Sequence, residues 1–176
     1  MYTIAAVTGY QALIESKHLP YWMGGHGDSK TAFESTMLNA PFCESSRSLY
    51  VWFLCMFGIY FGELVTHVFI EEHKKDFDEM LIHHLATCLA VFGSFYSGAV
   101  GIGAIISWIH CSSDIFIGLV KIAASTHYNE TTVVIYFMML SAWIFFRLMC
   151  LPFIIYSLAT SHMAVFPDPL SEFNFY

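Results

Sequence analysis

The chain has 176 residues, of which 57% are hydrophobic, 18% are aromatic and only 12% are charged. A soluble domain carries about 25% charged residues, so this composition, with its mean hydropathy of +0.59, indicates an integral membrane protein. The formal net charge of −7, with seven Lys and Arg residues and no basic cluster, argues against nucleic acid or anionic lipid as the main partner. The length allows one domain with about four spanning helices of roughly 20 residues each.

The predicted elements begin with a peripheral N-terminal segment, residues 1–48. Apolar residues near its start favour one short amphipathic helix, and the Pro- and Gly-containing stretch 19–25 favours a turn. Four apolar stretches follow, and each is long enough to form a spanning helix: residues 49–70, 80–96, 102–122 and 132–158. The tail, 159–176, contains prolines and acidic residues and is expected to lie outside the membrane. We therefore predict an all-α membrane bundle of about four transmembrane helices.

Ionisable side chains interrupt all four apolar stretches. An Asp or Arg side chain at mid-bilayer costs about 2.5–3.5 kcal/mol on insertion scales, so such groups usually face the inside of a bundle, pair with one another and mark a site. The main ones are Glu63, His67, His83, His84, His110, Asp114 and Arg147.

Four of these residues form the predicted catalytic set. His110 and Asp114 are four residues apart and share a helix face. A carboxylate bonded to one imidazole nitrogen raises the basicity of the other, which suits a general base or a nucleophile. His83 and His84 lie about 100° apart around their helix and can border one cavity. The set predicts a proton-handling site, although a single buried His is equally well explained as a packing residue bonded to a neighbour.

The remaining polar residues are assigned structural roles. Glu63 and His67 share a helix face and are predicted to clamp two helices together. Arg147 is expected to pair with Asp114 or Glu63, or to extend toward the membrane surface. Imidazole and carboxylate groups are also common metal ligands, but the chain lacks the H-x-x-H-H clusters of membrane di-iron oxygenases, so we predict no metal site.

Three short motifs resemble a known family. Residues 73–87 resemble the K-D-F-x-x-M-x-x-H-H-x-A-T segment of ceramide synthases, which are TLC-domain (TRAM/LAG1/CLN8) membrane proteins. Residues 109–114, Ile-His-Cys-Ser-Ser-Asp, are similar to the family's I-H-D-x-S-D, and residues 147–153 look like its R-L-x-x-x-P-F. The likeness covers most of the chain from residue 19 to 158, so residues 49–158 are identified as a TLC-like transmembrane domain.

The resemblance implies a reaction and assigns roles in it. Ceramide synthases join a fatty acyl group from acyl-CoA to the amine of a long-chain sphingoid base, with acyl-CoA as a substrate and no further cofactor. By resemblance, His83 and His84 carry out acyl and proton transfer, and His110 and Asp114 complete the polar centre.

Two departures from the family pattern bear on activity. Cys111 stands where the family has Asp. General acid–base catalysis by such a group accelerates a reaction by roughly 10²–10⁴-fold. The family's bundle also has six or more spanning helices, against about four predicted here. Without further helices, the polar groups would face lipid unless another protein covers them.

These departures lead to two hypotheses. The first is a shortened TLC-like protein with impaired catalysis, which contacts lipid and serves as a structural subunit of a larger membrane assembly; the mitochondrial inner membrane is a plausible host. Its partners would be membrane lipids and the membrane proteins that cover the missing helices. The alternative is an active ceramide synthase of the endoplasmic reticulum.

Overall fold

The computed structural model describes residues 1–19, 23–25, 45–71, 75–125, 129–156 and 160. These residues form helices and turns, and no strand occurs among them. The helices are α1 (Tyr2–Glu15), α3 (Arg47–Phe69), α4 (Phe77–Tyr96), α5 (Val100–Ser125), α6 (Asn129–Trp143) and the π-helix η2 (Ile144–Cys150). The all-α fold class is confirmed. The predicted turn at residues 19–25 lies partly, and the tail at 159–176 almost wholly, outside the described residues.

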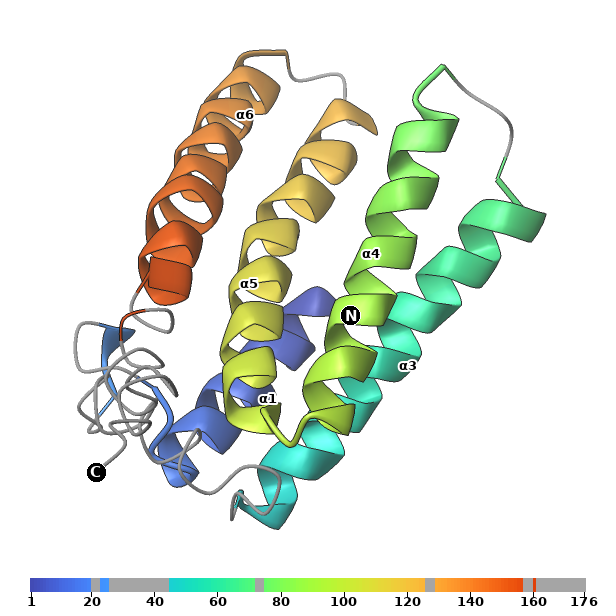
Figure 1. The fold of residues 1–176 in the computed structure, drawn as a ribbon. Helices are drawn as coiled ribbons and strands as arrows, with labels where there is room; N and C mark the ends of the chain where they lie inside the picture. Colours follow the sequence, from blue (N-terminus) through green and yellow to red (C-terminus); the bar gives the residue numbers. More distant parts are fainter. Residues whose placement is uncertain (20–22, 26–44, 72–74, 126–128, 157–159, 161–176) are drawn as a thin grey trace, which may run out of the picture.

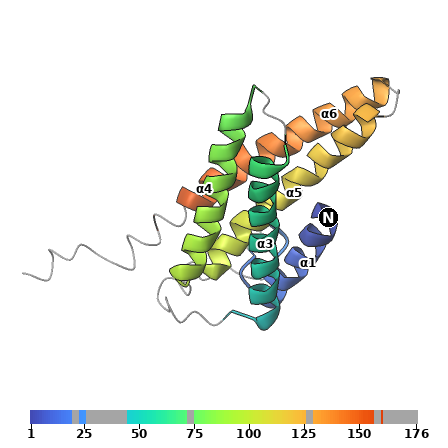
Figure 2. The same cartoon turned by 90° about the vertical axis from the view of Figure 1, so that its right-hand side faces the viewer.

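Helix α5 is the centre of the bundle. It contacts α1, α3, α4, α6 and η2, and Figure 1 shows it in the row of long helices between α6 and α4. Figure 2 shows that α5 and α6 lean together across the pair formed by α3 and α4, with the shorter α1 beside α3 and α5. The buried polar side chains of α5, such as Ser107, Ser112 and Ser113, therefore lie among other helices.

Three of the described helices are long and apolar enough to cross a membrane. They are Arg47–Phe69, Val100–Ser125 and Glu130–Tyr156. Helix α4 occupies the second predicted stretch, but it is not among these three; it carries two histidines, and its first turn contains Asp78 and Glu79. It joins α5 through a tight turn in which Gly98 adopts a φ of 71°, a conformation that glycine enters readily.

Helix α1 is packed into the bundle by its small residues. Its buried face consists of Ala5, Ala6, Gly9, Ala12 and Leu13. Small residues let helix backbones approach closely in membrane proteins. A Cβ atom added at Gly9 would lie only 2.4 Å from the Trp52 Cζ2 atom of α3. The predicted short helix is present, but it is not peripheral, because this face is covered by α3 and α5.

Two tryptophans bind α1 through its main chain. The Trp52 Nε1–H donates to the carbonyl oxygen of Ala5 at 2.8 Å, and the Trp108 Nε1–H donates to that of Ala6 at 2.9 Å. Buried indole N–H groups need such acceptors. Trp52 comes from α3 and Trp108 from α5, so the two bonds join α1 to both of the helices on which it packs.

Helix α6 is the most exposed part of the bundle. Only 6% of its span is buried, against 61% of the span formed by α5. Its exposed side chains include Val133, Val134, Phe137 and Met138. In a membrane protein, such an apolar surface is suited to contact with lipid or with another spanning helix.

Candidate functional site

Three histidines gather where α3 ends and α4 begins. His67 is buried, and its ring stacks on Phe77 with centroids 4.4 Å apart. The ring of His84 lies 5.3 Å from that of His67, and the ring of His83 lies 5.7 Å from that of His84. His84 is half-buried, whereas His83 is exposed. Of the two adjacent histidines, His84 is thus the one that lies against α3.

Both ring nitrogens of His67 are engaged. Its Nδ1 lies 2.7 Å from Glu71 Oε2, and its Nε2 lies 3.0 Å from the carbonyl oxygen of Phe77. Both partners are acceptors, so two hydrogen bonds require either two ring protons or a protonated Glu71. The i, i+4 spacing predicts a pair between Glu63 and His67. The structure instead uses the next acidic residue along the same face, because α3 continues to Phe69 and brings Glu71 within reach.

His67 nevertheless contacts a second helix, without Glu63. Its bond to the carbonyl oxygen of Phe77 joins the end of α3 to the first residue of α4. Glu63 lies half-buried on α3, one turn before His67.

A second polar group joins α5 to η2. Arg147 Nη2 donates to Asp114 Oδ1 at 2.8 Å, and Arg147 Nε donates to Ser113 Oγ at 3.2 Å. Ser113 Oγ also donates to the carbonyl oxygen of His110 at 2.8 Å. The side chains of Arg147 and Asp114 are 16% and 20% exposed, so the ion pair is largely removed from the surface. Of the partners predicted for Arg147, the structure selects Asp114.

His110 bonds within its own helix. Its Nδ1–H donates to the carbonyl oxygen of Ile106 at 2.9 Å, which leaves Nε2 of the neutral ring as an acceptor. The spacing predicts that His110 meets Asp114. In the structure Asp114 is bonded by Arg147, because η2 packs against α5, while His110 is bonded to Ile106 of its own helix.

Cys111 belongs to a different surface of α5. It is fully buried, and its thiol donates to the carbonyl oxygen of Tyr2 in α1 at 3.3 Å. The position at which the family motif has Asp therefore lies against the main chain of α1.

Sequence reasoning missed three participants: Glu71, Phe77 and Ser113. Glu71 follows His67 at the i, i+4 spacing, which is the signal that could have identified it. Ser113 lies within the motif at 109–114 and was assigned no role. Nothing in the sequence indicates that the Phe77 carbonyl is an acceptor. Within the described residues, no group of three or more His, Cys, Asp or Glu side chains is arranged to hold a metal ion.

The fold and the site together define an all-helical membrane protein with ionisable side chains between its helices. The model of the TLC domain (TRAM_LAG1_CLN8) matches residues 1–176, and the chain belongs to this family. The family inferred from the three motifs is therefore confirmed.

Several curated proteins are similar to this chain. ASC1-like protein 3 of Oryza sativa subsp. japonica is 28% identical over 108 residues, which make up 61% of this chain and 38% of that protein. Ceramide synthase LOH2 of Arabidopsis thaliana is 28% identical over 113 residues, 64% of this chain and 38% of that protein. Ceramide synthase hyl-2 of Caenorhabditis elegans is 25% identical over 175 residues, 99% of this chain and 50% of that protein. The chain thus spans half or less of the length of these relatives, and no solved structure matches it.

Proposed function

We propose that this protein is a TLC-domain membrane protein with impaired acyltransfer activity, which contacts lipid and serves as a structural subunit of a larger membrane assembly. The observation that carries the proposal is the position of Cys111. Its thiol is buried and bonded to the Tyr2 carbonyl, so the residue that replaces the family's carboxylate holds α1 in place. At this position the thiol therefore has a structural role, and it supplies no carboxylate for proton transfer.

The state of Asp114 supports the same proposal. A carboxylate that orients an imidazole must be free to bond its ring. Asp114 Oδ1 instead accepts from the Arg147 guanidinium at 2.8 Å, and His110 Nδ1 donates to Ile106. Of the residues expected to act as a His–Asp pair, Asp114 is thus engaged in holding α5 to η2, and His110 is bonded within its own helix.

The surface of the bundle supports a partner protein. His83 is exposed on α4, and a polar ring that faces hydrocarbon is unfavourable unless protein or water covers it. The side chains of α6 are mostly exposed and apolar. Another membrane protein that packs on these helices would shield His83 and use the apolar surface. For such a subunit, the proposed location is the mitochondrial inner membrane, which holds large multi-subunit complexes.

The second candidate is an active ceramide synthase of the endoplasmic reticulum. The observation that favours it is the cluster of His67, His83 and His84, whose rings lie within 5.7 Å of their neighbours. In this reaction the sphingoid amine attacks the acyl-CoA thioester, an amide forms and CoA thiol leaves. One of the histidines would take the amine proton and return it to the departing thiolate.

One purification separates the two candidates. We would extract the protein in mild detergent, measure the native mass of its particle and identify any co-migrating proteins by mass spectrometry. The subunit proposal predicts stoichiometric association with unrelated proteins and localisation with the mitochondrial inner membrane on fractionation. A particle that contains only this chain would favour the enzyme.

An acyltransfer assay completes the test. The purified particle would be supplied with acyl-CoA and a sphingoid base, alongside a His83→Ala variant. The proposal predicts no ceramide formation that depends on His83. Ceramide formation that His83→Ala abolishes would reject the impaired-enzyme proposal and establish the alternative.

A further inference from the structure

The buried ring of His67 joins the end of α3 to the start of α4. Its Nδ1 lies 2.7 Å from Glu71 Oε2, and its Nε2 lies 3.0 Å from the carbonyl oxygen of Phe77. Both atoms that face the ring are acceptors, whereas a neutral imidazole has a single N–H donor. The arrangement therefore holds one proton more than a neutral ring beside an ionised carboxylate.

This extra proton is assigned to the ring. The side chain of Glu71 is 58% exposed, whereas that of His67 is 6% exposed. Water stabilises the ionised form of an exposed carboxyl group. Glu71 therefore accepts as a carboxylate, and His67 donates from both nitrogens as an imidazolium.

The surroundings of His67 favour a positive charge on its ring. The residue lies in the last turn of α3, where the carbonyl dipoles of a helix attract a cation. The ring stacks on Phe77 with centroids 4.4 Å apart, and an aromatic face also attracts cations. The main-chain N–H of Glu71 donates to the carbonyl oxygen of Thr66 at 3.0 Å, which turns the chain so that the carboxylate lies beside the ring. These contacts oppose the cost of burying the charge.

Helix α4 brings two further titratable groups near this contact. The ring of His84 is 5.3 Å from that of His67, and Asp76 is the N-cap residue directly before Phe77. A carboxylate at Asp76 favours the charged ring, whereas a charged His84 would oppose it. The other acidic, basic and histidine side chains of α3, α4 and α5 are Arg47, Glu63, Asp78, Glu79, His83, His110, Asp114 and Lys121.

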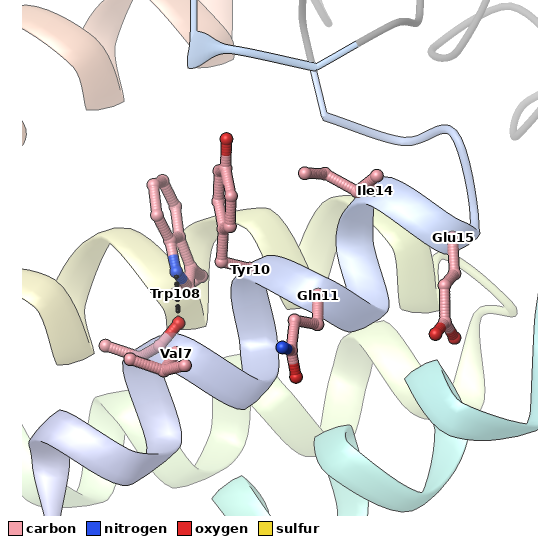
Figure 3. A pocket seen from close by; sticks show the side chains of 7 residues that line it. Val7, Tyr10, Gln11, Ile14, Glu15 and Trp108 are labelled. Atoms are coloured by element: carbon pink, nitrogen blue, oxygen red, sulfur yellow. Dashed lines mark hydrogen bonds between the residues drawn. The ribbon is translucent and has the colours of Figure 1, made fainter.

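Helix α1, which also packs on α3, carries one acidic side chain, far from His67. Figure 3 shows this residue, Glu15, at the end of α1 away from Trp108, and its carboxylate accepts from Ser48 Oγ at 2.6 Å. Ser48 is in the first turn of α3, roughly 28 Å from His67 at 1.5 Å per residue. The charge on His67 therefore depends on Glu71 and the start of α4, not on α1.

We propose that the His67–Glu71 pair is a proton-dependent latch, which holds the start of α4 while the ring is protonated and releases it when the proton is lost. The neutral ring keeps one N–H. That N–H stays with Glu71, because a hydrogen bond to a charged acceptor is the stronger one. The lone pair of Nε2 then faces the Phe77 carbonyl oxygen, so two acceptors oppose each other. Since the closed form binds more protons, its population falls as the pH rises.

The latch controls the position of the histidines on α4. Phe77 is the first residue of α4, and His84 follows two turns later with its ring against that of His67. The closed latch holds His84 against α3, and the open latch lets the first turns of α4 separate from it. This regulation goes beyond the proposed function and does not depend on whether the histidines are catalytic.

Amide hydrogen exchange of the full chain in mild detergent tests the latch. Variants are compared with the native protein at the same pH, between about pH 5.5 and about pH 9, a range that includes the ordinary titration of imidazole. The intrinsic dependence of exchange on pH then cancels. His67→Phe keeps a ring to stack on Phe77 but has no N–H. At the acidic end, the first two turns of α4 should exchange about tenfold or more slowly in the native protein than in His67→Phe. At the basic end the two proteins should exchange equally.

Glu71→Gln should make the latch insensitive to pH. The amide that it introduces can donate to Nδ1, so a neutral ring keeps its Nε2–H for the Phe77 carbonyl and α4 stays protected at the basic end. Glu79→Gln removes the same charge from the first turn of α4 but leaves the His67–Glu71 pair in place, and it should behave like the native protein. Protection of native α4 that does not change with pH, or protection that Glu71→Gln loses at the same pH as the native protein, would overturn the proposal.

Nitrogen NMR of the native chain labelled at histidine provides a second measurement that needs no folded variant of His67. The ring of His67 should show two N–H groups at the acidic end of the range and one at the basic end. A single N–H group throughout the range would overturn the proposal.

Discussion

The packing of α1 against two tryptophans can be tested at a single glycine. Alanine in place of a glycine inside an exposed helix normally stabilises by about 0.5–1 kcal/mol. At Gly9, however, the added Cβ would lie 2.4 Å from Trp52 Cζ2, 2.6 Å from Trp52 Cε2 and 3.0 Å from Trp108 Cδ1. These contacts involve rigid indole rings, each held by a hydrogen bond to α1. The substitution therefore forces α1 away from its neighbours.

The expected change in the free energy of unfolding follows from two opposing contributions, the helical gain from alanine and the overlap of its Cβ with the indole rings. Overpacking a core position costs typically 1–3 kcal/mol, and the helical gain offsets part of it, so Gly9→Ala should destabilise by about 1–2 kcal/mol. For a chain of this size, that loss lowers the apparent unfolding temperature by roughly 2–8 °C. Tryptophan fluorescence during heating in mild detergent measures it. Because α1 covers Cys111, a thiol reagent should also modify Cys111 faster in the variant, as peptide mass spectrometry would show.

Gly58 provides the matched control. It lies inside α3, and a Cβ added there would meet nothing within 4 Å. Gly58→Ala should therefore leave the unfolding temperature unchanged or raise it, and should not alter the modification of Cys111. If Gly9→Ala behaved like Gly58→Ala in both measurements, the close packing of α1 on Trp52 would be refuted.

Three further predictions concern charged and buried groups. Asp114→Asn leaves the Arg147 guanidinium without its anionic partner and should destabilise the bundle by about 2 kcal/mol, whereas Arg147→Lys, which keeps the charge, should cost less in the same thermal assay. Cys111→Asp places a carboxylate against the Tyr2 carbonyl and should lower the unfolding temperature. Cys111→Ser retains a hydrogen-bond donor and should leave the unfolding temperature unchanged. Equal stability of the two variants would contradict the contact between Cys111 and the Tyr2 carbonyl. Burial lowers the pKa of His18 from its ordinary value of 6.5, so the unfolded chain binds the proton first as pH falls. Stability should be full above pH 6.5 and decline below it, and a His18→Gln variant with the same pH profile would show that another group is responsible.

The sequence was sufficient to predict what depends on local pattern. Apolar stretches of spanning length give helices in a membrane because the backbone must satisfy its own hydrogen bonds there. The motif containing His83 and His84 identified the family that the match over residues 1–176 confirmed. The i, i+4 rule was not sufficient at His67, because it paired this residue with Glu63, whereas its partner in the structure is Glu71.

Only the tertiary structure decided which helix packs against the face of α5 that carries Asp114 and against the face that carries Cys111. Periodicity fixes the face on which Asp114 or Cys111 lies, but it carries no information about what packs against that face. Asp114 contacts Arg147 because η2 packs against α5. Cys111 contacts Tyr2 because α1 packs against both α3 and α5. The position of α1 depends in turn on the fit of its small residues to two indole rings. Such a fit is a property of three helices at once, which no local pattern in a single stretch of sequence specifies.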